Sequence, residues 1–343
     1  MKLFYCVLLL CLTCNFLYAQ DTASVIDSKQ FFIEETPIDA TITTDFGTLL
    51  NNKNTADIKA TFSLKLPDSS IIREDIIMKT RGHFRLENCF IPPLKLDFKK
   101  PGAPKLSSLK SLKLVNGCNT GSYNDQLLLK EFLVYKIYNL ICEKSFRVRL
   151  VNLKLEDSRG KKKPMNLHSF FIEDLDALAK RNQCKKLDES IKIKTESTNR
   201  MHMTLVSIFE YMIGNTDWSV TVNHNIRLIR VKSDSVSRPY PVPYDFDYAG
   251  LVDASYAVPD EKLGTQSVRE RVYRGYTRNI SELNEIIEVF KTQKENIYSL
   301  IKNFGLLSPG NKKEMINYLN EFYNSIKSDN DLKEHFIDKA RTE

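Results

Sequence analysis

The sequence predicts an α+β protein in which a strand-rich first half is followed by a mostly helical second half. Residues 57–66 alternate between apolar and polar side chains, which is the pattern of a half-buried strand. Two more short apolar runs, at 76–80 and 94–98, follow after turn residues. We expect these three segments to form one antiparallel sheet. Beyond residue 173, the apolar side chains instead recur at the spacing of amphipathic helices.

One helix is expected in the first half. Residues 125–140 carry apolar side chains at helical spacing, with Glu131 near the opposite face. Strand-like alternation returns at 148–155, and an abruptly acidic helix start follows the next apolar run. We therefore expect an N-terminal antiparallel-sheet lobe with one helix at 20–172 and a mostly helical C-terminal lobe at 173–343.

In the second half, a helix is expected at 203–213. This helix stops at Gly214, which suits a C-terminal cap because glycine adopts the left-handed conformation readily. A short strand is expected at 226–231. After a polar loop, residues 242–247 are expected to return to the same neighbourhood. Two amphipathic helices close the chain, at 282–304 and 312–326.

The first 19 residues have the composition of a secretory signal peptide. Lys2 precedes an apolar run at 3–17, and Ala19 offers a small residue at the cleavage position. A retained membrane anchor is the alternative, although a span needs roughly 20 apolar residues. No later segment is apolar enough to cross a bilayer. We expect an exported mature chain that is periplasmic, extracellular or at the cell surface, with no transmembrane segment.

Four cysteines remain after the expected signal peptide: Cys89, Cys118, Cys142 and Cys184. An even number in an exported chain permits two disulfides, but the sequence does not rank the possible connectivities. None of these cysteines forms a Cys-x-x-Cys pair, so structural thiols or disulfides are favoured over zinc ligands.

The formal net charge of +7 is spread along the chain. Nucleic-acid grooves usually combine basic clusters with aromatic side chains, and this sequence has no such interleaving. We therefore expect no nucleic-acid partner.

The segment 214–247 holds the residues that point most clearly to chemistry. It places Asp217, Asn225 and Asp245 around a predicted strand and two turns. A divalent cation bound to nucleotide phosphates needs only one or two protein oxygens, and a phosphoryl acceptor needs a separate carboxylate to orient its hydroxyl. A simpler alternative for Asp217 is that it caps backbone amides at a helix end.

Asp247 is either a rival or a partner of Asp245. The two carboxylates flank Phe246, so strand alternation points both of them to one side. Two close carboxylates repel each other unless a cation or an arginine lies between them. Asn223 is likewise a rival of Asn225 as a metal ligand.

The order of these parts resembles the spore-coat CotH kinase family, an atypical protein-kinase-like group. The resemblance covers residues 78–256 and is strongest at 213–247, where the Tyr-Asp-Phe-Asp segment lies. It implies a two-lobed protein-kinase-like fold. It also implies ATP as substrate, with Mg²⁺ or Mn²⁺ as the metal.

The resemblance implies a role for each matching residue in the second lobe. Asp217 corresponds to the catalytic-loop carboxylate, and Asn225 corresponds to a metal ligand. Asp245 corresponds to the principal magnesium ligand, with Asp247 beside it.

In the first lobe, the resemblance implies that Arg81 of the Arg-Gly turn faces phosphate and that Lys95 is the strand lysine. Glu131 on the helix is expected to pair with that lysine. The segment 171–173 is expected to be the hinge against the adenine.

Two functions follow as hypotheses. The first is an exported kinase that phosphorylates a protein or glycan acceptor. The second is a catalytically inactive kinase-like binding or scaffold protein of the cell envelope. The sequence contains no Gly-x-Gly-x-x-Gly loop, which favours the scaffold. The retention of Asp217, Asn225 and Asp245 together favours the kinase.

An arginine group follows the Asp-Phe-Asp element, at Arg269, Arg271 and Arg274. It could hold an acidic or phosphorylated substrate. The alternative is that these arginines pair with neighbouring acidic residues on a solvated helix.

Overall fold

The computed structural model describes residues 26–51, 56–82, 84–99 and 102–342. The predicted signal peptide lies outside this part of the chain. Within it, no helix is long and apolar enough to cross a membrane.

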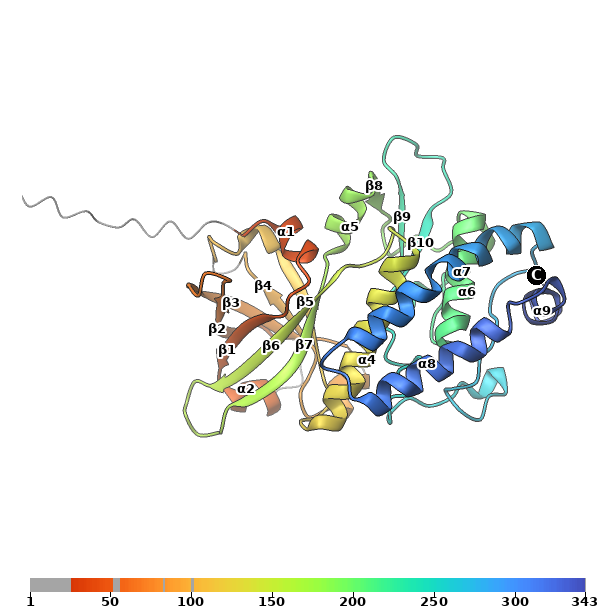
Figure 1. Ribbon diagram of the computed structural model, residues 1–343. Helices are drawn as coiled ribbons and strands as arrows, with labels where there is room; N and C mark the ends of the chain where they lie inside the picture. Colours follow the sequence, from red (N-terminus) through yellow and green to blue (C-terminus); the bar gives the residue numbers. More distant parts are fainter. Residues whose placement is uncertain (1–25, 52–55, 83, 100–101, 343) are drawn as a thin grey trace, which may run out of the picture.

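Seven strands of the first half form a closed barrel (Figure 1). In barrel order they are β1 (Ile38–Thr44), β2 (Ile58–Lys65), β3 (Ile71–Thr80), β4 (Leu94–Asp97), β5 (Ser111–Asn116), β7 (Met165–Ile172) and β6 (Val148–Asp157). Neighbouring strands are antiparallel except β1 and β6, which run parallel and close the barrel. The prediction of a simple antiparallel sheet was therefore wrong, because closure depends on a pairing between strands about a hundred residues apart that no local pattern reveals.

Alternation along each strand separates the barrel interior from its outer face. On β2, the residues Ile58, Ala60, Phe62 and Leu64 are buried, while the residues between them are partly or fully exposed. Phe62 contacts Phe98 and Phe171 inside the barrel. The period of two that predicted this strand thus supplies the side chains that fill the barrel.

Four α-helices occur among the described residues of the first half, so the prediction of one helix was wrong. They are α1 (Ser28–Ile33), α2 (Phe46–Asn51), α3 (Phe84–Asn88) and α4 (Ser122–Ile141). Only α4 was predicted, because the other three have five or six residues and are too short to show a helical period.

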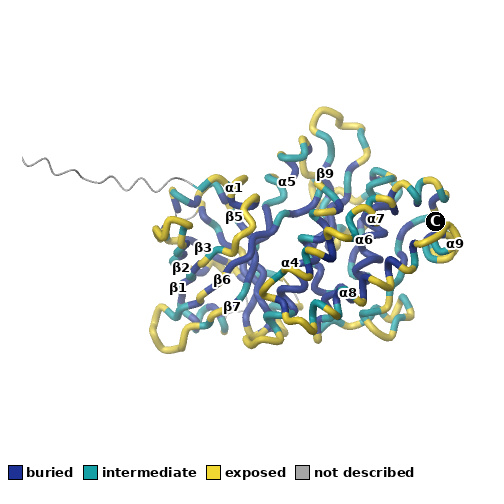
Figure 2. Tube along the Cα trace, viewed as in Figure 1, coloured by how far each residue is buried: buried dark blue, intermediate teal, exposed yellow. Residues whose placement is uncertain are grey.

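Helix α4 lies between the barrel and the helical half of the molecule (Figure 1). It is buried on several sides because it packs against β7 on one side and α7 on another. Figure 2 shows buried residues continuing from the barrel strands into the helices around α4 and α6. Glu131 on α4 is therefore placed in the interior rather than on a solvated face.

As far as the structure describes it, the second half contains five α-helices and a small antiparallel sheet. The helices are α5 (Leu175–Arg181), α6 (Arg200–Ile213), α7 (Ile280–Asn303), α8 (Pro309–Asn324) and α9 (Asp329–Leu332), and the sheet is β10 (Tyr240–Pro243), β9 (Ile226–Val231) and β8 (Cys184–Lys186). The predicted helices at 203–213, 282–304 and 312–326 are confirmed by α6, α7 and α8, and the predicted strand at 226–231 is confirmed by β9.

Gly214 ends α6 and turns the chain toward the candidate site. Its φ of 68° lies in the left-handed region, and a Cβ there would lie 1.9 Å from the Tyr318 hydroxyl oxygen. Both facts require glycine at this position. The predicted cap is therefore confirmed, and Asp217 follows it on a loop.

Candidate active site

The loop that carries Asp217 is held by side chains buried beneath it. The Asp217 amide donates a hydrogen bond to Asn215 Oδ1 at 3.0 Å. The Asn215 amide group donates in turn to Glu210 Oε2 at 2.9 Å, and both residues are 1% exposed. Arg274 donates to the carbonyl oxygens on either side of Asp217, those of Thr216 and Trp218. The loop is thus supported from both α6 and the segment before α7.

Asp217 and Asn225 form a hydrogen-bonded pair. Asn225 Nδ2 donates to Asp217 Oδ2 at 3.0 Å and to the Asp217 carbonyl oxygen at 2.8 Å. The other carboxylate oxygen, Oδ1, lies 2.7 Å from His224 Nε2. Both carboxylate oxygens of Asp217 thus contact side chains. The alternative that Asp217 caps backbone amides is therefore wrong. Asn223 instead donates to the Glu189 carbonyl oxygen, so Asn225 is the amide next to Asp217.

Phe246 anchors the two neighbouring carboxylates. Its fully buried ring packs against Tyr135 and Phe209, with centroid separations of 4.7 and 5.6 Å. Asp245 has a φ of 67°, and its amide donates to the Tyr135 hydroxyl at 2.8 Å. A non-glycine residue in this conformation is uncommon and needs firm support from its surroundings. The aromatic packing supplies that support.

Asp247 is buried, with 6% exposure, and accepts a hydrogen bond from the Tyr256 hydroxyl at 2.9 Å. Burial and the charge of Asp245 raise the pKa of Asp247 to about 6, while Arg85 and Tyr256 act in the opposite direction. Asp245 is therefore close enough to disfavour the ionised form of Asp247. A cation between them would relieve this repulsion.

Glu131 reaches the same region from α4. It is 3% exposed, and burial raises its pKa well above the usual value. Asp247 and Asp245 add to that rise, while Arg85 and Arg81 oppose it. The expected pairing of Glu131 with Lys95 does not form among the described residues. Its cationic neighbours are arginines because Lys95 lies on the exposed outer face of β4.

Lys113 on β5 is the strand lysine that faces this group. Its Nζ lies 4.6 Å from the centroid of the Tyr244 ring. Burial, with the charges of Arg81 and Arg227, lowers the pKa of Lys113 to about 8, and Asp245 opposes this shift. Sequence reasoning missed Lys113. The alternation of residues 111–116 could have indicated that Lys113 shares a sheet face with Lys95.

Arg81 lies in the segment after β3 and joins the same cluster. Its amide donates to the Pro93 carbonyl oxygen at 3.0 Å. Its charge acts on both Lys113 and Glu131, so it lies within electrostatic reach of β5 and of α4. Its Nε is buried and has no hydrogen-bond partner.

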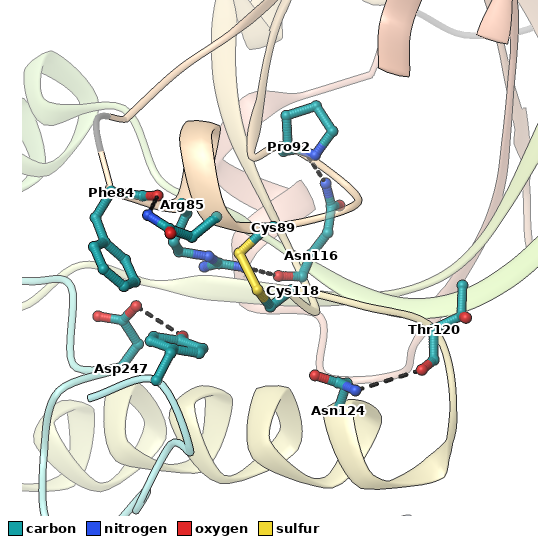
Figure 3. The surroundings of a disulfide bond; sticks show 11 residues. Phe84, Arg85, Cys89, Pro92, Asn116, Cys118, Thr120, Asn124 and Asp247 are labelled. Carbon is teal, nitrogen blue, oxygen red and sulfur yellow. Dashed lines mark hydrogen bonds between the residues drawn. A yellow bond between two sulfur atoms is a disulfide. The ribbon is translucent and has the colours of Figure 1, made fainter. Parts of the chain in front are cut away.

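Sequence reasoning also missed Arg85, which lies beside a disulfide whose pairing the sequence left open (Figure 3). Cys89 is bonded to Cys118, while Cys142 and Cys184 are free. The structure therefore contains one of the two disulfides that the cysteine count permits. The pairing joins the end of α3 to the loop after β5, which no sequence spacing could specify.

The donor set fits a divalent cation that is held partly by a nucleotide. Within the described ranges, no three His, Cys, Asp or Glu side chains converge as a complete metal cage. Asn225, Asp245 and Asp247 supply one amide and two carboxylates. Mg²⁺ commonly uses one or two carboxylates and takes its other ligands from phosphates and water. These residues could therefore hold Mg²⁺ or Mn²⁺ together with a nucleotide.

The arginine group at 269–274 is engaged inside the protein. Arg269 pairs with Asp253 and Glu314, at 3.0 and 2.7 Å. Arg271 pairs with Glu321 at 2.8 Å. With Arg274 bound to the loop carbonyls, these side chains stabilise the helical half rather than form a free cationic patch. They lie on an irregular segment instead of the expected helix.

The predicted hinge, 171–173, lies where β7 ends. Glu173 is buried and pairs with Arg181 at 3.0 Å. It also accepts a hydrogen bond from the Arg147 amide at 3.1 Å. A contact between this segment and an adenine ring stays a prediction.

The solved structures that are similar to this chain include two kinases. The Helicobacter pylori proinflammatory kinase CtkA is 14% identical over 72% of this chain and 91% of that chain, with a TM-score of 0.40. The Golgi casein kinase is 9% identical over 89% of this chain and 76% of that chain, with a TM-score of 0.35. No protein-family model matches the sequence, and no curated protein matches it. Similarities this low leave the function to be argued from the residues of the site.

Proposed function

We propose that this protein is an exported atypical kinase with a kinase-like two-lobed fold, which transfers a phosphoryl group from ATP to a hydroxyl on a protein or glycan. The observation that carries the proposal is the convergence of Asp217 and Asn225 with Asp245 and Asp247. These residues come from two separate loops of the helical half. Lys113, Arg81 and Glu131 approach the same group from the barrel, the segment after β3 and α4.

Each residue has a role that its surroundings support. Asn225, Asp245 and Asp247 would hold Mg²⁺ or Mn²⁺, which supplies charge neutralisation at the phosphates when bound. Lys113 and Arg81 would bind phosphate oxygens, and the bidentate guanidinium of Arg81 could replace the missing glycine-rich loop. Whether Lys95 also contacts the nucleotide stays a prediction.

Asp217 would orient the acceptor hydroxyl and take its proton. Its carboxylate is 37% exposed, so an acceptor can reach it. The contacts to His224 and Asn225 fix its direction while each oxygen keeps a further lone pair. A fixed, partly exposed carboxylate next to a metal-binding group is the arrangement that phosphoryl transfer requires.

Export is supported by two independent features. Residues 1–19 have the pattern of a signal peptide. Cys89 and Cys118 form a disulfide, and such bonds persist mainly in oxidising compartments. We therefore propose a periplasmic, extracellular or cell-surface location.

The second candidate is a catalytically inactive scaffold with the same fold. The observation that favours it is the replacement of a lysine partner for Glu131 by Arg85 and Arg81. The absence of a glycine-rich phosphate loop from the sequence points the same way.

Nucleotide binding separates the two candidates. The test is the melting temperature of purified residues 20–343 with ATP and Mg²⁺ or Mn²⁺, for the wild type, Asp245→Ala and the remote surface control Asp338→Ala. A ligand at 100 times its dissociation constant adds about 2.7 kcal/mol of stability. We expect a metal-dependent rise in melting temperature that Asp245→Ala abolishes and Asp338→Ala keeps. No rise with any nucleotide would leave the scaffold as the better account.

A further inference from the structure

Arg85 lies in α3 between the disulfide and the acidic group of the site. One of its terminal nitrogens donates to the Asn116 carbonyl oxygen. Cys89 follows Arg85 by four residues, and its partner Cys118 follows Asn116 by two. Figure 3 shows Arg85, Asn116 and the disulfide together, with Asp247 nearby. The disulfide therefore ties the segment that carries Arg85 to the segment that Arg85 binds.

A cavity of about 10 Å³ lies between Arg85 and the carboxylates, which is the space that about one water molecule needs. Its lining includes Arg85, Glu131, Asp247 and Tyr256. Glu131 Oε1 and Arg85 Nε are buried without a hydrogen-bond partner. No direct ion pair joins Arg85 to either carboxylate among the residues that the structure describes. Arg85 thus places a positive charge near these carboxylates without occupying their oxygens.

This placement affects two kinds of ligand in opposite directions. A free divalent cation is repelled by a nearby guanidinium, whereas a metal–ATP complex is anionic overall and is attracted by it. Four carboxylates surround the site: Asp217, Asp245, Asp247 and Glu131. Without a compensating cation on the α3 side, they would bind a bare metal ion well and an anionic metal–nucleotide complex poorly.

We propose that Arg85 is a positioning residue that balances the charge of the nucleotide site, and that the Cys89–Cys118 disulfide holds it there, so that reducing this bond weakens binding of an anionic metal–nucleotide complex. The proposal rests on the proposed function because it concerns the regulation of the same site. It makes nucleotide binding depend on the redox state of the surroundings.

The Cys89–Cys118 disulfide is the covalent link between the end of α3 and the segment after β5. The helix has five residues, and so short a helix is not stable by itself. Apart from the bond at Cys89, Phe84 packs at centroid distances of 5.9 Å from Tyr256 and 6.2 Å from Tyr248, and it is 42% exposed. These aromatic contacts are the alternative to the disulfide as the anchor that holds Arg85 in place.

Reduction can be carried out with a phosphine. The phosphorus gives two electrons to the sulfur–sulfur bond and becomes a phosphine oxide. Water supplies the oxide's oxygen and the two protons of the new thiols. The products are free Cys89 and Cys118, and α3 is then tied to the barrel only by non-covalent contacts.

The test measures dissociation constants for Mn²⁺ alone, by the electron paramagnetic resonance signal of free Mn²⁺, and for Mn²⁺–ATP. The variants are Arg85→Gln, Arg85→Lys and the double variant Cys89→Ser with Cys118→Ser. Controls are Arg73→Gln, on the exposed face of β3, and Cys142→Ser. If the double variant does not fold, phosphine-treated wild type replaces it, with thiol alkylation confirming the cleavage.

We expect Arg85→Gln to weaken Mn²⁺–ATP binding about tenfold, while Mn²⁺ alone binds equally well or more tightly. Arg85→Lys should recover most of the Mn²⁺–ATP affinity. The reduced protein should behave as Arg85→Gln does. A purely structural role would weaken both ligands in Arg85→Gln, and lysine would not rescue it.

Two results would overturn this proposal alone, and two more concern the proposed kinase as well. Loss of both affinities in Arg85→Gln would make the residue structural. Unchanged Mn²⁺–ATP binding after reduction would assign the anchoring to the aromatic contacts of Phe84. A wild type that binds Mn²⁺ but not Mn²⁺–ATP would contradict the proposed kinase. The charge-balance role of Arg85 would then stand if Arg85→Gln binds Mn²⁺ at least as tightly as the wild type does, and would fail if it binds Mn²⁺ more weakly. A wild type that binds neither Mn²⁺ nor Mn²⁺–ATP would contradict both the proposed kinase and the role of Arg85.

Discussion

Lys95 and Lys113 are directly paired across strands β4 and β5, yet only Lys113 approaches the acidic group of the candidate site. Opposite residues of an antiparallel pair point to the same sheet face, so the two lysines share an orientation. They differ in surroundings because β5 borders β7 and the helical half, whereas Lys95 is exposed. The pair is a natural matched control for nucleotide binding.

Replacing each lysine with methionine separates their roles. Lys113→Met should weaken ATP binding about tenfold or more, because it removes a partly buried charge beside the proposed phosphates. Lys95→Met should change the affinity by less than about twofold, as an exposed surface change does. Isothermal titration with ATP and Mg²⁺ measures both. The reverse ranking would support Lys95 as the nucleotide-binding lysine and remove Lys113 from the site.

Substitutions of Asp217 and Asp245 should affect different steps, catalysis for Asp217 and metal-dependent ATP binding for Asp245. Asp217→Asn should lower kcat by about 10²–10⁴-fold while ATP binding stays within about twofold, since a catalytic carboxylate acts on the acceptor. Asp245→Asn should instead lose metal-dependent ATP binding. Phosphate transfer from γ-labelled ATP to a general acceptor mixture gives the rate, and thermal shift gives the binding. Asp217→Asn with full activity would return this residue to a structural role.

Arg274 should control the position of Asp217. Arg274→Gln removes the donors to the carbonyl oxygens on either side of Asp217, and it should lower kcat with little effect on ATP affinity. Each carbonyl left unsatisfied costs about 1–3 kcal/mol of stability where it is buried. Amide hydrogen exchange in residues 214–220 should become faster in this variant. Arg200→Gln, which loses the ion pair with Glu282, is the control and should leave this exchange unchanged.

Glu210 should make stability depend on pH. Burial raises the pKa of Glu210 to about 8 in the folded protein, against an ordinary value of 4.5. Below pH 4.5 both states are protonated, and its contribution is fully present. As pH rises through the window from 4.5 to 8, the unfolded chain loses this proton first, so the free energy of unfolding falls by at most about 1.4 kcal/mol per pH unit.

Glu210→Gln keeps the shape and a carbonyl acceptor for Asn215, but it does not titrate. The variant should therefore gain stability relative to the wild type between pH 5 and pH 8, as measured by urea unfolding at each pH. Glu131 and Asp247 titrate in both proteins, so the difference isolates Glu210. A constant difference across this range would mean that Glu210 keeps an ordinary pKa.

The cysteines allow a direct chemical check of the chain's connectivity. Non-reducing peptide mapping should recover Cys89 joined to Cys118, with Cys142 and Cys184 as free thiols. Cys184 is buried and Cys142 partly so, and both should react with alkylating agents much faster after unfolding. A Cys142–Cys184 bond in the native protein would contradict this assignment.

The sequence was sufficient to predict the longer elements and to bring together three of the candidate residues. Helices α6, α7 and α8 repeat apolar residues over several turns, so local periodicity specified them. Asp217, Asn225 and Asp245 lie within thirty residues of one another, on turns that glycine, asparagine and proline mark. These residues lie close together because the chain leaves their neighbourhood along β9 and returns to it along the antiparallel strand β10.

Only the tertiary structure determines which residues of the barrel half join the candidate site. Closure of the sheet, the choice of Lys113 over Lys95 as the lysine beside Asp245, and the placement of Arg85 all depend on contacts between distant segments. Lys95 and Lys113 are chemically identical and lie on equivalent strands, so no local pattern distinguishes them. Their difference arises because the helical half covers one and leaves the other in solvent, and burial is a property of the packed chain rather than of its neighbours in sequence.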